Sequence, residues 1–170
     1  NAADWEQAVV QMAAFMALAR QLGDENALIF GLSARSIVAF RQSDEPSFTR
    51  FGTELHDKAR RHHNDQFSRA YPLYRGIAAL RRGELESATR LFAEAEFYLH
   101  KSKDSLGRII LGGLISRCLL LQGKPQDALR RAEEALALAE TVRFSVESVG
   151  EGVSSVAEVY LELWEAGSAP

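Results

Sequence analysis

The chain repeats part of itself at an interval of forty residues, and this repetition constrains its fold more than any other feature. Residues 74–98 and 114–138 are identical at six of their twenty-five aligned positions. The identical pairs are Leu80 and Leu120, Gly83 and Gly123, Ala88 and Ala128, Arg90 and Arg130, Glu94 and Glu134, and Ala95 and Ala135. A fixed period of this length is typical of folds that stack one supersecondary unit many times. Leu163–Gly167 again ends on glycine, and we interpret it as the start of a third copy.

Hydrophobic residues recur with a helical period along nearly the whole chain, and no stretch of strict alternation predicts a strand. Glycine, proline, Asp and Asn residues stand at the ends of the periodic segments, where they cap or stop helices. These signals predict helices over about residues 3–22, 25–41, 46–63, 66–82, 84–101, 104–122, 125–141 and 145–166. Because the joints are short, consecutive helices are expected to form antiparallel hairpins.

The expected fold is therefore all-α, an α-solenoid of antiparallel helix pairs. Gly83 and Gly123 permit tight turns. Ala88 and Ala128 are expected to be buried where the two helices of each hairpin cross, and they leave room for a close approach. A helix, a glycine turn, a small residue at Ala88, a large one at Phe92 and a small one at Ala95 resemble the tetratricopeptide repeat. The motif is clearest over residues 67–141, and its period is forty residues against the roughly 34 of the standard repeat.

Repeats with helices of this length are similar to the tetratricopeptide-like region of LuxR-type activators of the maltose-regulon kind. They are also similar to the same region of large bacterial ATPase and cyclase regulators, and residues 18–24 and 128–140 carry this likeness. The resemblance implies a non-catalytic binding or regulatory module that presents a concave helical groove to a peptide, an effector or a partner domain.

The domain organisation is predicted from the start of the chain, which lacks Met, together with the resemblance. Asn1 and Ala2 are interpreted as the remnant of an expression tag, and residues 3–170 are expected to be a single repeat domain taken from a longer bacterial regulator. Other domains of that parent chain are then candidate partners. The main alternative is a self-association scaffold, a homodimer formed through the apolar end faces of the array.

Composition excludes several other classes of protein. The formal net charge of -3 provides no basic surplus for a phosphate backbone, so direct contact with nucleic acid is not expected. The single Cys118 excludes a disulfide framework and suits a reducing compartment, which predicts a cytoplasmic location. The apolar stretch 109–121 is too short to span a membrane. The sequence 110–113 lacks the Gly-Lys-Ser/Thr ending of a phosphate loop, so no cofactor is expected.

Four polar residues are the candidates for a ligand or partner groove. They lie on the first helices of successive pairs, which line the concave surface of a tetratricopeptide-like stack. They are Arg35, Tyr74, Arg75 and Arg117. Their donors could converge on an anionic ligand or a peptide through charge-assisted hydrogen bonds. The alternative is that the arginines pair with acids of the chain, such as Glu54 or Glu94.

The last predicted helix carries an acidic stripe that is a candidate partner face. At 100° per residue, its acids fall within about 60° of arc. They are Glu147, Glu151, Glu158, Glu162 and Glu165. An apolar face is expected opposite them, formed by Val149, Val153, Val156, Tyr160 and Leu163. Such a stripe is usually solvated, but it could dock a basic partner or a later segment of the parent chain.

The rival function is a helical enzyme that uses the cluster of His56, His62 and His63. We do not expect a metal or catalytic site there, because His62 and His63 point about 100° apart on a helix. Positive charge at the end of a helix explains the run 58–63 better, since it complements the helix dipole. Cys118 is expected to be a buried structural thiol, and the Trp and Phe residues are expected to lie in the core.

Overall fold

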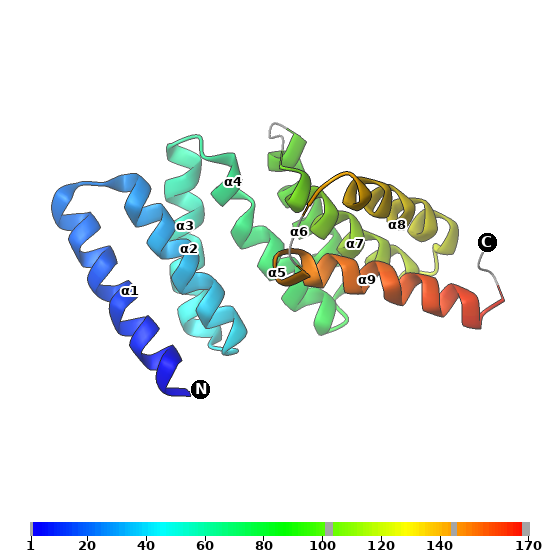
Figure 1. The fold of residues 1–170 in the computed structure, drawn as a ribbon, viewed down its shortest axis with the longest axis horizontal. Coiled ribbons are helices and arrows are strands. Elements are labelled where there is room, and N and C mark those ends of the chain that lie inside the picture. Colours follow the sequence, from blue (N-terminus) through cyan, green and yellow to red (C-terminus); the bar gives the residue numbers. More distant parts are fainter. Residues whose placement is uncertain (1, 101–103, 144–145, 168–170) are drawn as a thin grey trace. The chain divides into compact units, whose positions relative to one another are not determined.

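The structure of the protein is a computed structural model, and it describes residues 2–100, 104–143 and 146–167, with the backbone alone for residues 2–4 and 146–149 (Figure 1). These residues contain helices and no strand, which confirms the all-α class. The helices are α1 (Ala2–Leu22), α2 (Glu25–Arg41), α3 (Glu45–Arg61), α4 (Asp65–Ser68), α5 (Ala70–Arg81), α6 (Leu85–His100), α7 (Ser105–Leu121), α8 (Pro125–Glu140) and α9 (Val146–Glu165). None of the described helices is both long and apolar enough to cross a membrane.

The predicted helix over 66–82 is wrong in one respect, because the structure divides it into α4 and α5 at Arg69. Pro72 explains the division. Proline has no N–H, so the carbonyl of Ser68 loses its helical donor four residues further on. The Nδ1 of His56 donates to that carbonyl instead, at 2.9 Å. His56 of the neighbouring α3 therefore satisfies the carbonyl that the break leaves without a helical donor.

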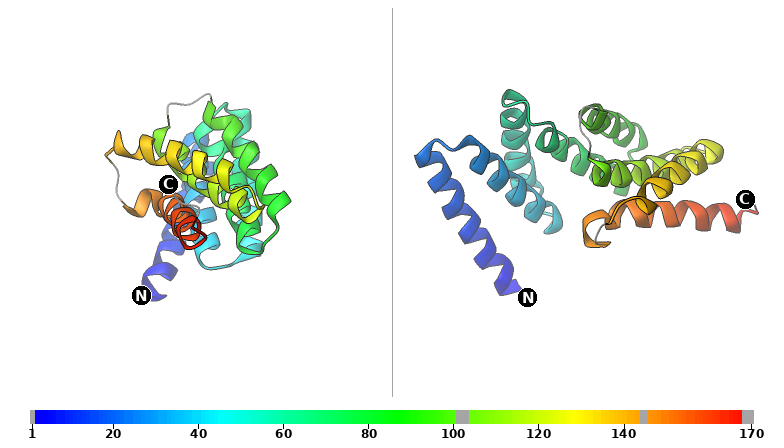
Figure 2. Two further views of the ribbon diagram at one scale, coloured as in Figure 1. Left: turned by 90° about the vertical axis from the view of Figure 1, so that its right-hand side faces the viewer. Right: turned by 45° about the horizontal axis from the view of Figure 1, so that its top comes forward.

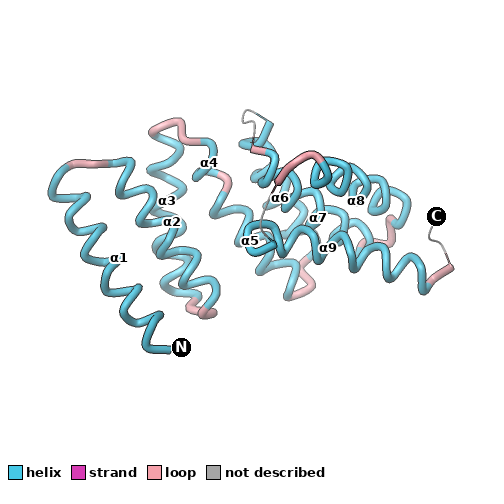
Figure 3. The backbone as a smooth tube through the Cα atoms, viewed as in Figure 1, coloured by secondary structure: helices cyan, strands magenta, loops and turns pink. Residues whose placement is uncertain are grey.

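The chain divides into two compact units, residues 1–74 and 75–170, and the division falls within α5. In the first unit, α2 packs against both α1 and α3. In the second, α7 packs against α8 and α9 and also touches α6 (Figures 1 and 2). Short loops join most of the helices, as expected for hairpins (Figure 3). The organisation of residues 3–170 as one repeat domain remains a prediction.

Five of the described turns between helices lie at multiples of twenty residues from one another, twenty apart from position 23 to 83 and forty from 83 to 123. A residue with positive φ ends a helix at positions 23, 43, 63, 83 and 123. In each turn the next residue donates its backbone N–H to the carbonyl five positions earlier, over 2.8 to 3.0 Å, at residue 19, 39, 59, 79 or 119. This is the Schellman arrangement that closes a helix. The five turns are therefore copies of one structure.

The core of the first unit combines aliphatic and aromatic side chains. One cluster joins α1, α2 and α3 through Met16, Ala19, Leu28, Ile29, Leu32 and Leu55. A second brings Phe48 and Tyr71 together, with ring centroids 5.5 Å apart. Gly52 makes this possible, because a Cβ at that position would overlap the Tyr71 ring.

The core of the second unit is a seam of small residues. Ala128 and Ala132 are fully buried between α8 and α9, and Ala88 is fully buried in α6, as predicted for the two repeat alanines. A Cβ on Gly112 would lie 2.9 Å from the Cβ of Ala135, and one on Gly113 would overlap the backbone of Gly152. The helices of this unit thus meet almost backbone to backbone.

The expectation that the Trp and Phe residues lie in the core is wrong for five of those that the structure describes, and Phe144 lies outside the described residues. The exposed rings are those of Trp5, Phe15, Phe30, Phe97 and Trp164, and that of Trp164 is 72% exposed. Helical spacing places a ring on a face of its helix, but it does not say whether another helix covers that face. The prediction for Cys118 is confirmed, since the thiol is buried beside the hydroxyl of Thr89 at 3.3 Å.

Candidate functional site

Two of the four predicted groove residues, Arg35 and Tyr74, belong to the first unit, and each packs against an aromatic ring. The guanidinium carbon of Arg35 lies 4.8 Å from the centre of the Phe51 ring, a cation–π geometry between α2 and α3. The ring of Tyr74 packs on Phe40, with centroids 5.0 Å apart. Both side chains are half-buried, so each has a structural role within its unit.

The other two predicted groove residues belong to the second unit. Arg117 pairs with Glu158 of α9, with 2.7 Å between Nη1 and Oε2, so its charge is neutralised inside the chain. Arg75 is exposed on α5. None of the four predicted residues lines the pocket described below, and their convergence on one groove remains a prediction.

The three histidines have separate positions and separate partners. His56 bonds the carbonyl of Ser68, as described above. His62 lies 3.7 Å from a carboxylate oxygen of Glu25, which also accepts a hydrogen bond from Lys58 at 2.8 Å. Lys58 lowers the pKa of Glu25 below its ordinary value of 4.5. His63 forms the turn after α3 with φ of 52°. Among the described residues, no group of three or more His, Cys, Asp or Glu could hold a metal ion.

The acidic stripe of α9 is divided between internal pairs and solvent. Glu151 pairs with Arg81 of α5 at 2.5 Å, and Glu158 with Arg117 of α7. Glu162 and Glu165 are exposed at the end of α9, whereas the side chain of Glu147 lies outside the described residues. Glu151 and Glu158 therefore join α9 to other helices of its own unit. Glu162 and Glu165 face solvent.

The apolar face predicted for α9 is partly wrong. Val156 and Leu163 are buried as predicted, but Val153 is 37% exposed and the fully buried valine is Val159. The side chain of Val149 lies outside the described residues. The buried face is rotated because Gly152, which no hydrophobicity pattern detects, is the point where α9 meets the backbone of α7.

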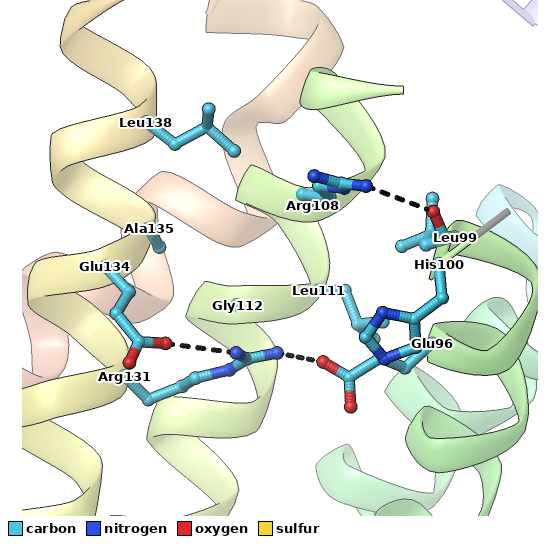
Figure 4. Close-up of a pocket in the computed structure, with 10 residues that line it drawn as sticks. All are labelled: Glu96, Leu99, His100, Arg108, Leu111, Gly112, Arg131, Glu134, Ala135 and Leu138. Carbon is cyan, nitrogen blue, oxygen red and sulfur yellow. Dashed lines mark hydrogen bonds and ion pairs between the residues drawn. The ribbon is translucent and has the colours of Figure 1, made fainter. Parts of the chain in front are cut away.

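A half-open pocket of about 240 Å³ lies between α6, α7 and α8 (Figure 4). Its floor forms where Gly112 and Ala135 bring α7 and α8 together. Apolar side chains from all three helices form its walls: Leu99, Leu111, Ala135 and Leu138. The small residues of the seam therefore create the pocket, since larger ones would fill it.

The polar side of the pocket is an ion-pair network centred on Arg131. Its guanidinium bonds Glu96 of α6 and, at 3.1 Å, Glu134 of its own helix (Figure 4). Arg108 reaches from α7 to the carbonyl of Leu99, at 3.5 Å, near the negative end of the α6 dipole. Two cations and two carboxylates thus face the same cavity, together with the imidazole of His100.

Sequence reasoning missed this pocket, although part of its signal is visible. Arg131 and Glu134 are three residues apart, which is the spacing of an ion pair on one helix. Glu96 lies thirty-five residues from Arg131, and no local pattern connects them.

A scan of protein-family models, a search of curated proteins and a search of solved structures each returned no match.

Proposed function

We propose that the chain is a non-catalytic binding module and that the pocket between α6, α7 and α8 is its ligand site. The observation that carries the proposal is the pocket itself, in which apolar walls face a small number of convergent charged groups. This is the usual make-up of a small-molecule site. Both carboxylates of the pocket, Glu96 and Glu134, are paired with Arg131, and this pairing favours a binding role.

The finer fold assignment belongs to the same proposal. Turns of one structure recur every twenty residues from position 23 to 83 and again at 123, and two twenty-residue steps equal the forty-residue period of the sequence repeat. This register supports an α-solenoid of tetratricopeptide-like helix pairs. On the resemblance to LuxR-type activators and to ATPase and cyclase regulators, we assign the module to a larger bacterial regulator in which binding controls another domain.

The size of the pocket limits the ligand. Sites for drug-sized molecules measure about 300 to 1,000 Å³, so a cavity of about 240 Å³ suits a smaller group. A free amino acid has this size, as does one side chain at the end of a peptide.

The charges of the pocket indicate a zwitterion with an apolar side chain. A ligand carboxylate can replace Glu134 on Arg131, because Glu134 is the more exposed of the two acids at 55%. The displaced Glu134 would then face the ammonium group of the ligand. Leu111 and Leu138 remain to contact an apolar side chain.

Titration calorimetry with three probes tests this proposal. L-leucine carries both charges, 4-methylpentanoate lacks the ammonium and 3-methylbutylamine lacks the carboxylate. We expect L-leucine to bind and each reduced probe to bind about tenfold more weakly or worse, the cost of one lost charge-assisted bond. Equal binding of all three, or of none, would contradict the proposal.

The adjacent arginine supplies a matched control for the pocket. Arg130 and Arg131 are neighbours on α8, and each pairs with an acid three residues away, but only Arg131 lines the cavity. Arg131→Gln is expected to abolish L-leucine binding, whereas Arg130→Gln leaves it unchanged. If both variants bind like the parent chain, the ligand site lies elsewhere.

The enzyme built on His56, His62 and His63 is the less supported function. His56 already bonds the Ser68 carbonyl, and His62 faces Glu25 on the surface. A metal-content assay of the purified chain is its direct test, since stoichiometric zinc that is lost in a His62→Ala, His63→Ala variant would restore it.

A further inference from the structure

The second unit has an apolar stripe on α9 that its own helices do not cover. We call it the outer face, and it consists of Val153, Ala157, Leu161 and Trp164. At 100° per residue these positions lie within about 80° of arc, on the side away from the buried Val156 and Val159. Leu161 is 54% exposed and Trp164 is 72% exposed. A continuous apolar stripe of this kind marks an interaction surface.

The packing of α9 on α7 indicates what kind of element could cover this stripe. Gly113 of α7 meets the backbone of Gly152, and four residues further along α7 Arg117 pairs with Glu158. Both contacts advance along the two helices in the same direction, so α9 lies parallel to α7. One helix therefore packs on the next through a stripe at four-residue spacing.

The sequence places the outer face of α9 at the equivalent position. The turns after α7 and α9 are both formed by a glycine, Gly123 and Gly167, which sets an offset of forty-four residues. With that offset Gly113 corresponds to Ala157 and Arg117 to Leu161. Gly113 and Arg117, through which α7 contacts α9, thus correspond to Ala157 and Leu161, which are exposed in α9.

Charge decides what kind of helix would dock there. Residues 146–165 of α9 contain five glutamates and no Lys or Arg. Glu162 and Glu165 remain exposed beside the stripe, beyond the two acids that pair with Arg81 and Arg117. A second copy of this face would bring like charges together, whereas a basic helix would complement them.

We propose that the outer face of α9 docks an amphipathic helix whose apolar stripe is flanked by Lys or Arg. The apolar stripe of the partner covers Leu161 and Trp164, and its cations pair with Glu162 and Glu165 as Arg117 pairs with Glu158. Helix-in-groove recognition of this kind relies on anchors at the spacing of the outer face. This surface is separate from the pocket, and the two proposals can fail independently.

Trp164 serves as the reporter in the test. The chain has two tryptophans, so Trp5→Phe leaves Trp164 as the single one. The probe is a synthetic peptide of about 18 residues, long enough to form a helix, built from Leu, Ala and Lys. Its control carries Glu in place of every Lys. We expect the basic peptide to shift Trp164 emission to the blue, with an affinity that falls as salt rises, and the acidic peptide to cause no shift.

Two matched substitutions on the surface complete the design. Leu161→Ala is expected to weaken binding of the basic peptide about tenfold, whereas Leu136→Ala, on the exposed side of α8, leaves it unchanged. Circular dichroism of each variant establishes that it is folded. No shift with the basic peptide, or the same shift with the acidic one, overturns the proposal. A shift that appears without peptide as protein concentration rises also overturns it, and assigns the face to a second copy.

Discussion

The two units close their helix hairpins with the same backbone turn but use different residues to form it. In the first unit Ser43 and His63 take the left-handed conformation beside Gly23, with φ of 57° and 52°, whereas glycines alone take it in the described part of the second unit, at Gly83, Gly123 and Gly167. The residue after each turn of the first unit caps the next helix with its side chain, at Asp24, Asp44 and Asn64. In the second unit Asp104 caps α7 in the same way, but Lys124 provides no side-chain cap for α8.

The units also differ in how their helices approach one another. Gly52 and Gly112 occupy equivalent positions in the register, sixty residues apart. Gly52 makes room for the ring of Tyr71, whereas Gly112 makes room for the Cβ of Ala135 and hence for a helix. At equivalent positions of the turn register, the space above a glycine is therefore occupied by an aromatic ring in one unit and by a neighbouring helix in the other. We expect the aromatic packing and the close helix contact to differ in how well they tolerate an added side-chain atom.

The largest effect is expected from Gly113→Ala in the second unit. The new Cβ would overlap the carbonyl group of Gly152, which is backbone on a packed helix and cannot rotate away. Because α7 and α9 must separate, we expect the free energy of unfolding to fall by about 3 kcal/mol, measured by urea denaturation. Gly150→Ala is the control, since nothing lies within 4 Å of its Cβ and alanine favours the helix. Similar destabilisation by both variants would contradict the close contact.

Gly52→Ala in the first unit is expected to cost less, about 1 to 2 kcal/mol. Its Cβ would overlap the ring of Tyr71, but a side chain can tilt where a backbone cannot. Combining it with Tyr71→Leu should remove most of the penalty, and a double-mutant cycle measures this coupling. Purely additive effects would show that the ring does not fill the space above Gly52.

Much of the fold could be predicted from the sequence because its helix ends carry local signals. Gly23, Gly83 and Gly123 ended helices where expected, and Pro125 began one. The twenty-residue register was missed because Ser43 and His63 occupy two of its turns, and neither is a typical residue for a positive φ. The break at Arg69 also escaped, although Pro72 is visible, because a helix can tolerate proline when another group satisfies the carbonyl.

The site was less predictable than the fold for a physical reason. Arg117 is a cation in the sequence, but only packing brings Glu158 within 2.7 Å of it and pairs the two charges. In the same way, the pocket depends on Glu96 and Arg131 meeting across α6 and α8. Long-range pairs of this kind are determined by the crossing of helices, which no single helical pattern contains.

Substitutions at the turn residues are expected to have smaller effects on the free energy of unfolding, of opposite sign in the two units. Gly123→Ala is expected to lower the free energy of unfolding by about 1 kcal/mol, because a side chain disfavours positive φ. Ser43→Gly should raise it by about 0.5 kcal/mol, since relief of that strain exceeds the entropy lost by glycine. Thermal unfolding of the two variants beside the parent chain measures both signs. Destabilisation by Ser43→Gly would mean that the Ser43 side chain itself stabilises the turn.

The smallest effect is expected from the charge of the Asp44 cap. Its carboxylate accepts the backbone N–H of Ser47 at 3.1 Å. Hydrogen bonding to the Ser47 side chain first, and to this N–H second, holds the pKa of Asp44 below its ordinary value of 3.8. A carboxyl whose pKa is lowered by folding stabilises the protein above the pKa of the unfolded chain, and this contribution disappears as pH falls through the folded value. Asp44→Asn keeps an acceptor oxygen and removes the charge. The variant should therefore unfold at a slightly lower temperature than the parent chain at pH 7, and the difference should vanish below the lowered pKa. Lys124→Ala, at the equivalent cap of the second unit, should show no such dependence because Lys124 makes no side-chain cap bond. If the difference between Asp44→Asn and the parent chain is the same at pH 7 and at acid pH, the charge of the Asp44 cap contributes nothing to stability.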